Sequence, residues 1–261
     1  MNVRPKKSLG QHFLTDTSVA ERIAATLDSY IGMPVIEVGP GMGMLTRFLL
    51  ERGHDLTVVE LDSESVDFLR VNFPQLQGRI IEEDFLKLDL DKVVPGDGPF
   101  CVIGNYPYNI SSQIFFHLLD YRDRVACCSG MLQREVAQRL AAEPGGKERG
   151  ILSVLLQMWY DIDYLFTVSE HVFNPPPKVK SGVIRMVRNA VTDPGCDPRL
   201  FKSVVKTAFG QRRKTLRNSL RGMLPPDVSP QLMEMPVWGM RPEQLSVEQF
   251  VELTNLISSK S

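Results

Sequence analysis

The chain has 261 residues, of which 43% are hydrophobic and 23% charged, a globular composition that excludes disordered, collagen-like and coiled-coil proteins. It contains no apolar run of the roughly 18–20 residues needed to cross a bilayer, and no apolar segment follows its basic N-terminus, so we expect a cytoplasmic protein with no signal peptide and no membrane partner. The net charge of −1 by itself predicts no affinity for nucleic acid, and the four cysteines lack the spacing and histidine partners of a zinc site, so we expect reduced thiols and no bound metal.

The N-terminal half alternates apolar strands with helical segments. An amphipathic helix at Asp16–Leu27, capped by Thr15 or Asp16, comes first. Strands are then predicted at Pro34–Val38, Leu56–Leu61, Arg79–Glu82, Phe100–Gly104 and Val125–Leu132. Helices are predicted between them at Met44–Leu50, Ser63–Val71 and Ile110–Leu119. Near-continuous apolar strands that alternate with helices indicate an α/β fold with a parallel sheet covered on both faces.

A glycine-rich turn, Gly39-Pro40-Gly41-Met42-Gly43, follows the first strand. Glycine lets the backbone turn tightly and approach a ligand with no Cβ in the way. Glu60 closes the second strand, where a carboxylate can accept hydrogen bonds from both ribose hydroxyls, and Asp84 follows the third, where it can accept one from an adenine amine. A GK[ST] sequence is missing, and Met44 replaces the last glycine of GxGxxG, which argues against triphosphates and NAD. The pattern favours S-adenosylmethionine, which carries ribose and adenine without phosphate.

Asn105-Tyr106-Pro107-Tyr108 directly follows the fourth strand, at the edge where open α/β sheets bind ligands. An adenine N6 amine is a poor nucleophile because its lone pair is delocalised into the ring. The Asn105 carbonyl and a backbone carbonyl can accept both N–H bonds and direct the lone pair at a sulfonium methyl, so positioning rather than a general base drives transfer. Pro107 makes the turn rigid, and Tyr108 offers a surface on which an extruded base can stack.

The last third of the chain changes character. Two strand-like runs, Asp161–Val168 and Gly182–Val187, flank the proline-rich segment Asn174–Lys178, and the linker TDPGCDP follows. Helices are predicted after the linker at Phe201–Phe209, Arg212–Met223 and Ser246–Ile257. We therefore predict an α/β domain over residues 1–189 and a helical domain over residues 190–261.

Basic charge is concentrated between Lys178 and Arg221, where twelve basic residues are opposed only by Asp193 and Asp197. This stretch carries a net charge of +10 and the rest of the chain −11. It is either a phosphate-binding surface or a solvated helix face. The candidate RNA-binding residues are Lys178, Lys180, Arg212, Arg213, Lys214, Arg217 and Arg221. Those after Ala208 cannot all share one helical face, so we expect some to pair with acids and others to meet RNA.

Over nearly its full length the chain resembles the KsgA/RsmA-type ribosomal RNA adenine dimethyltransferases. The resemblance lies in KSLGQHFL (Lys7–Leu14), EVGPGMGMLT (Glu37–Thr46), VVELD (Val58–Asp62), EEDFL (Glu82–Leu86), GNYPYNISSQI (Gly104–Ile114), MLQREVAQRL (Met131–Leu140), FNPPPKVKSGVIR (Phe173–Arg185) and AFGQRRKTLRNSL (Ala208–Leu220). The last two discriminate most, because generic methyltransferases lack them. The resemblance implies a Rossmann-like methyltransferase domain with a mostly parallel seven-stranded sheet and a small, all-α C-terminal domain that contacts RNA.

The resemblance also implies roles for single residues. It makes S-adenosylmethionine the cofactor, held by His12, Leu14, Gly39, Gly41, Glu60, Asp84 and Asn105. Asn105 and the backbone at Tyr106 would accept the target amine in the turn that Pro107 completes, Tyr108 would stack on the base, and Phe173 would form a second aromatic wall. The chain departs from the family at His12, where asparagine is more frequent, and at Tyr106, where leucine is common. A backbone acceptor tolerates the second change; the first leaves open how position 12 contacts the donor.

The implied reaction gives N6,N6-dimethyladenosine at two adjacent adenosines in a hairpin loop near the 3′ end of 16S rRNA. The partner would be the small ribosomal subunit or its precursor, met late in assembly by a monomeric enzyme. Two alternatives stay open: a relative that modifies one adenine in large-subunit rRNA, and an assembly factor whose binding matters more than its chemistry. The sequence FGQRRKTLRNSL argues against the first, and intact Asn105 and Tyr108 argue against the second.

Overall fold

The computed structural model describes residues 3–6, 9–224 and 233–258, which form two compact units. The first unit contains the described residues up to Gln138 together with Asp161–Arg188. The second contains Arg139–Tyr160 and the described residues from Asn189 onward. Residues 139–160 thus group with the C-terminal segment, whereas the sequence analysis places them in the first domain. The domain division at residue 189 stays a prediction.

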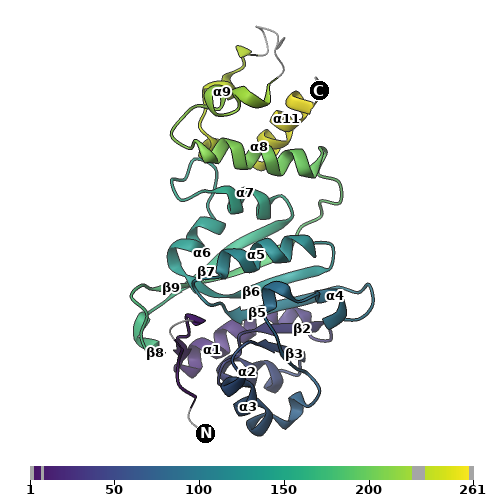
Figure 1. Ribbon diagram of the computed structural model, residues 1–261, viewed down its shortest axis with the longest axis vertical. Helices are drawn as coiled ribbons and strands as arrows, with labels where there is room; N and C mark the ends of the chain where they lie inside the picture. The colour runs from purple at the N-terminus through teal and green to yellow at the C-terminus, as the bar shows by residue number, and fades with distance from the viewer. Residues whose placement is uncertain (1–2, 7–8, 225–232, 259–261) are drawn as a thin grey trace. The chain divides into compact units, whose positions relative to one another are not determined.

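A seven-stranded sheet in the order β4-β3-β2-β5-β6-β9-β7 forms the centre of the first unit (Figure 1). Its strands are β2 (Pro34–Val38), β3 (Asp55–Glu60), β4 (Ile80–Glu82), β5 (Phe100–Asn105), β6 (Val125–Gln133), β7 (Tyr160–Val168) and β9 (Ser181–Arg188). Neighbours from β4 to β6 pair in parallel, and β9 pairs antiparallel with β6. The predicted Rossmann-like, mostly parallel sheet is confirmed.

Helices lie on both faces of this sheet. The longer ones are α1 (Thr17–Ala24), α2 (Met44–Glu51), α3 (Ser63–Asn72), α5 (Ser111–Asp120) and α6 (Arg134–Leu140). The first three share one apolar core with Val35 of β2, Ile103 of β5 and Cys127 of β6. Cys128 points to the opposite face, because side chains alternate along a strand. On that face the Cys128 thiol contacts the Tyr106 hydroxyl. The Tyr106 ring packs edge-on against the Phe115 ring of α5.

Short elements complete the first unit and bring distant segments together. They are η2 (Ala25–Tyr30), η3 (Pro74–Leu76), η4 (Phe85–Lys87), α4 (Leu90–Val93) and η5 (Glu170–Val172). In addition, β1 (Phe13–Leu14) pairs antiparallel with β8 (Phe173–Asn174), with Leu14 opposite Phe173. The sequence analysis did not predict this pairing, because two-residue strands carry no periodicity. It ties the N-terminal segment to the loop before β9.

The second unit is helical. Its elements are α7 (Ile151–Gln157), α8 (Pro198–Gly210), α9 (Leu216–Ser219), η6 (Arg221–Met223), η7 (Pro236–Gly239), η8 (Pro242–Gln244) and α11 (Val247–Ser258). Phe250 of α11 packs on Phe201 and Phe209 of α8, with ring centroids 6.5 and 6.1 Å apart. Arg149 is fully buried and donates a 2.5 Å hydrogen bond to Gln157. These contacts give the unit a core of its own.

The predicted helix at Arg212–Met223 is wrong. The chain leaves α8 at Gly210, turns at Gln211–Lys214, and resumes as the short α9 at Leu216. Thr215 is extended (φ −70°, ψ 158°), and the Leu216 N–H donates to the Met240 carbonyl instead of to a preceding helical turn. This tertiary hydrogen bond overrides the local helical pattern.

The described part of the chain lacks a membrane-spanning helix and a cluster of metal-binding side chains. No helix there has the length and apolarity to cross a bilayer. Nor do His, Cys, Asp and Glu side chains gather there in groups of three or more that could hold a metal ion.

Candidate active site

A cavity of about 270 Å³ opens in the first unit at the carboxyl ends of β2, β3 and β5. It is lined by residues 9–14 from the N-terminal segment, 37–42 and 44–45 around the glycine turn, 59–61, 83–86 and 105–110. Open α/β sheets bind ligands at this edge, because the loops there can diverge around a ligand. All the predicted cofactor residues, from His12 to Asn105, line this one cavity.

The glycine turn has the backbone conformation that its sequence predicts. Gly39, Gly41 and Gly43 have φ values of +66°, +55° and +75°, in the left-handed region that side chains disfavour. A Cβ at Gly43 would also overlap the Phe73 ring, and one at Gly41 would come within 3.0 Å of Phe13. The turn therefore requires glycine for its conformation and for its packing.

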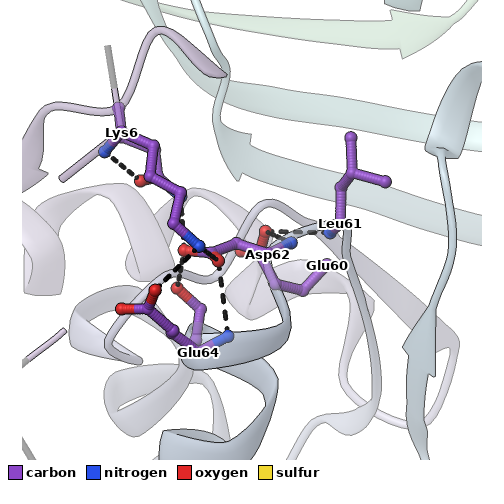
Figure 2. Close-up of polar contacts among 7 residues, drawn as sticks. Lys6, Glu60, Leu61, Asp62 and Glu64 are labelled. Atoms are coloured by element: carbon purple, nitrogen blue, oxygen red, sulfur yellow. Dashed lines mark hydrogen bonds and ion pairs between the residues drawn. The ribbon is translucent and has the colours of Figure 1, made fainter. Parts of the chain in front are cut away.

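Glu60 is the polar centre of the donor side. It is 6% exposed, and its carboxylate accepts a 3.0 Å hydrogen bond from the backbone N–H of Gly41. It also accepts 2.9 Å hydrogen bonds from the backbone N–H groups of Leu61 and Asp62 (Figure 2). Burial raises its pKa, although these hydrogen bonds oppose the shift. Since a carboxylate has about four lone-pair positions, one remains for a ribose hydroxyl. Asp84 also lines the cavity, and its Oδ1 accepts a 3.0 Å hydrogen bond from Leu86 N.

Asp62 anchors the N-terminal segment beside the cavity. It forms an ion pair with Lys6 (Figure 2), and it accepts a 3.1 Å hydrogen bond from the Gln11 amide. Lys6 also pairs with Glu64 at 3.1 Å. Gln11 lines the cavity, so these contacts hold the segment in place there. Lys7 and Ser8 of the same motif lie outside the described residues. The sequence analysis missed this anchor, because nothing in the spacing of Lys6 and Asp62 links them.

Glu37 is a second site residue that sequence reasoning missed. It is 1% exposed, lines the cavity, and accepts a 2.7 Å hydrogen bond from Thr46 Oγ1. Burial raises its pKa to about 8, which favours the neutral carboxylic acid at neutral pH. The available signal was a carboxylate inside an apolar strand, a position that is costly unless the group is neutral or partnered.

The Asn105 amide is oriented by the backbone. Its Nδ2 donates a 3.1 Å hydrogen bond to the His12 carbonyl. Because a carbonyl can only accept, Oδ1 points the other way, and no described residue donates a hydrogen bond to it. Asn105 thus presents an acceptor at the cavity.

Tyr106 lines the cavity, yet its side chain is 1% exposed. The hydroxyl donates to the carbonyl of Ser129, on the neighbouring strand β6, at 2.8 Å. A Cβ at Gly104 would come within 3.1 Å of this ring, so glycine makes room for tyrosine here. The hydroxyl of Tyr106 is thus committed to the protein interior, and a role for its backbone in the site stays a prediction.

Tyr108 is held at two points. Its hydroxyl shares a 2.5 Å hydrogen bond with Ser181 Oγ, and its ring stacks on His12, with centroids 5.5 Å apart and planes at 30°. Burial raises the pKa of the Tyr108 hydroxyl. Phe173 does not line the cavity: it is 4% exposed and belongs to the apolar core. The aromatic neighbour of Tyr108 in this structure is therefore His12, in a position that sequence reasoning assigned to the donor.

The basic candidates are distributed over both units. Lys178 and Lys180 are exposed in the loop before β9, within the first unit. In the second unit, Arg213, Lys214, Arg217 and Arg221 are exposed. Arg212 is half-buried and pairs with Glu243 at 3.7 Å, and Arg217 donates to the Met233 carbonyl. The only acid paired with these residues in the described part of the chain, Glu243, belongs to the second unit, and contact of the others with RNA stays a prediction.

Comparisons with known proteins agree on one class. The family model described as "Ribosomal RNA adenine dimethylase" matches residues 2–259. A protein of Parabacteroides distasonis named "Ribosomal RNA small subunit methyltransferase A" is 68% identical over 258 residues, covering 99% of this chain and 95% of that protein. A protein of the same name in Porphyromonas gingivalis is 61% identical over 257 residues, covering 98% and 99%.

Two solved structures share the architecture. A dimethyladenosine transferase from Plasmodium falciparum has a TM-score of 0.79 at 20% identity, covering 95% of this chain and 98% of the other. The 23S rRNA methyltransferase ErmE has a TM-score of 0.71 at 25% identity, covering 94% and 99%. The first similarity concerns the fold; the second also concerns a protein whose name includes a ribosomal RNA substrate.

Proposed function

Because the chain belongs to the ribosomal RNA adenine dimethylase family, we propose that it dimethylates N6 of two adjacent adenosines in a hairpin loop near the 3′ end of 16S rRNA. The chain is an S-adenosylmethionine-dependent methyltransferase of ribosomal RNA. The proposed substrate is the small subunit or its precursor, in line with the names of the relatives. The enzyme would act late in subunit assembly, in the cytoplasm, as a monomer.

The residues on the donor side fit S-adenosylmethionine. Glu60 keeps a lone pair for the ribose, Asp84 lies where an adenine amine can donate to it, and the left-handed turn at Gly39–Gly43 lets the backbone come close. His12 and Leu14 line the same cavity from the N-terminal segment. When bound, S-adenosylmethionine supplies an electrophilic methyl group. The chain's own contribution is to fix the direction from which the nucleophile approaches it.

The acceptor side positions the target amine. Asn105 Oδ1 accepts one N–H of the adenine amine, and the Tyr106 carbonyl, held by the rigid Pro107, accepts the other. These bonds pull the amine toward a pyramidal shape and turn its lone pair to the donor side. Holding the two reacting groups in this geometry can supply much of the rate enhancement of a reaction that needs no strong base.

A base can reach this cavity only after leaving its stack, at a cost of a few kcal/mol. The Tyr108 ring offers a surface that recovers roughly 1–3 kcal/mol by stacking. The exposed Lys178 and Lys180 of the first unit would bind RNA phosphates, and so would Arg213, Lys214 and Arg221 of the second. Arg212 and Arg217 are partly committed to protein contacts and would contribute less. Residues 190–261 are thus the proposed RNA-contacting domain.

The observation that carries the proposal is that Asn105, Pro107 and Tyr108 line the same cavity as Gly41 and Glu60. The test incubates the protein and S-adenosylmethionine with small subunits that lack the modification and, in parallel, with protein-free large-subunit rRNA. Nucleosides are then analysed by mass spectrometry. Dimethyladenosine in the small subunit alone is expected.

One alternative has support of its own, because ErmE shares the fold at 25% identity over most of both chains. An enzyme of that class would place dimethyladenosine in the large-subunit RNA alone. Binding without methylation of either RNA would instead identify an assembly factor. Either result would overturn the proposed reaction.

A further inference from the structure

His12 contacts both catalytic side chains of the proposed reaction. Its backbone carbonyl accepts the 3.1 Å hydrogen bond from Asn105 Nδ2, and its imidazole stacks on Tyr108. The imidazole is itself held, because Nδ1 lies 2.8 Å from the Pro175 carbonyl. Since that carbonyl can only accept, Nδ1 carries the hydrogen. One residue therefore links Asn105, Tyr108 and the loop before β9.

These contacts define what the side chain can do. One ring nitrogen is committed to Pro175 and one ring face to Tyr108. The Tyr108 ring is then fixed at its hydroxyl by Ser181 and on one face by His12. Offset-stacked rings with centroids 4.5–7 Å apart attract each other. A base that stacks on Tyr108 must use the opposite face.

We propose that His12 is a positioning residue: its imidazole holds the Tyr108 ring at the angle at which a stacked adenine presents N6 to Asn105. The inference rests on the proposed function, since it needs an adenine on Tyr108. It assigns both the side chain and the backbone carbonyl of residue 12 to the acceptor side of the site. Asparagine at this position could still donate to Pro175, but it has no ring to stack.

The contacts favour a role in holding the Tyr108 ring over one in which the His12 ring merely occupies the place of the target base. A ring that only filled the place of the target base would have to leave when RNA binds. Leaving would break the hydrogen bond to Pro175 as well as the stack, and it would disturb the neighbouring carbonyl that orients Asn105. The contacts that hold His12 are thus contacts that the catalytic arrangement needs.

Three variants separate the two side-chain contacts. His12→Asn keeps a donor for Pro175 and removes the ring, His12→Phe keeps the ring and removes the donor, and His12→Ala removes both. The full-length proteins are compared on small subunits lacking the modification, by kcat, by KM for RNA and by Kd for S-adenosylmethionine. A stacking contact of this kind corresponds to roughly a three- to tenfold change in rate. We expect kcat to fall by this factor in the Asn and Ala variants and to stay near the wild-type value in the Phe variant. The Kd for S-adenosylmethionine should stay within about twofold of wild type in all three.

A double-mutant cycle identifies the route of the effect. If His12 acts through Tyr108, the His12→Ala change has little further effect once Tyr108→Ala is present. Equal effects in both backgrounds would overturn the proposal in favour of a merely structural role. A change confined to the Kd for S-adenosylmethionine would assign the His12 side chain to donor binding. A His12→Ala enzyme faster than wild type would show that the ring occupies the place of the target base. Either result would overturn the proposal. If wild-type protein leaves small subunits unmethylated, the proposed function itself has failed, which is a separate result.

Discussion

The two halves of the cavity are built differently. The donor half, consisting of Gly39–Gly43, Glu60 and Asp84, comes from three strand ends that are close in sequence, and backbone N–H groups hold its central carboxylate. The acceptor half consists of His12, Asn105–Tyr108 and Ser181, which are far apart in the chain and hold one another mainly through side chains. A backbone-built site tolerates change around it, whereas a side-chain network fails when one member is lost. We therefore expect the largest effects in the acceptor half.

Replacing Asn105 by alanine tests the acceptor half most strongly. The change removes the acceptor for the target amine, and loss of one such positioned hydrogen bond typically lowers kcat by about 100- to 1000-fold. Single-turnover methylation of small subunits measures the effect. Asn72→Ala is the matched control, because Asn72 is exposed on α3 and donates only to the Phe68 carbonyl. Nearly normal turnover by the Asn105 variant would remove this residue from the mechanism.

Glu60→Gln tests the donor half. The amide loses the charge and one oxygen that faces the N–H groups of Gly41, Leu61 and Asp62, so one buried donor is left without its acceptor at a cost of about 1–3 kcal/mol. Calorimetric Kd for S-adenosylmethionine should rise roughly ten- to 100-fold. Glu82→Gln, at an exposed position on β4, should leave Kd unchanged. Equal Kd values for the two variants would contradict the role of Glu60.

The basic residues of the second unit belong to neither half of the cavity, so their replacement should change RNA binding and leave cofactor binding unchanged. Replacing Arg213 and Lys214 together by alanine removes two exposed charges, and the slope of log K against log salt should fall by about 1.4–1.8 if both contact phosphate. RNA binding measured at several salt concentrations gives this slope. The charge-matched pair Arg70→Ala and Lys92→Ala, exposed in the first unit, is the control. A slope equal to that of the control pair would assign Arg213 and Lys214 to a solvated surface.

The smallest effect is expected at the N-terminal anchor. Lys6→Met breaks the ion pairs with the buried Asp62 and the exposed Glu64, while Asp62 keeps its hydrogen bonds from Gln11 and Ser65. KM for S-adenosylmethionine should rise about two- to threefold, because the segment that lines the cavity is held less firmly. Lys92→Met breaks an ion pair with Asp89 on α4 and serves as control. An effect no larger than the control would show that Gln11 alone suffices as anchor.

The same contrast explains what the sequence could predict. The turn at Gly39–Gly43 was predictable because its glycines are clustered directly after an apolar strand. The carboxylate of Glu60 was predictable because it ends the next strand along the chain. The stack of His12 on Tyr108 and the burial of Phe173 were not, because they depend on the pairing of β1 with β8, two residues long on each side. The break at Thr215 escaped prediction for a similar reason, since a hydrogen bond to the distant Met240 carbonyl decides it.

The central claim is that one cavity brings the methyl donor and the N6 amine of an extruded adenosine together. The most direct measurement maps the product: small subunits methylated by the wild-type chain and by Asn105→Ala are digested to RNA fragments and sequenced by mass spectrometry. We predict two adjacent dimethyladenosines in one fragment near the 3′ end for the wild-type chain, and none in the same time for the variant. Methyl groups on another fragment, or equal methylation by the variant, would contradict it.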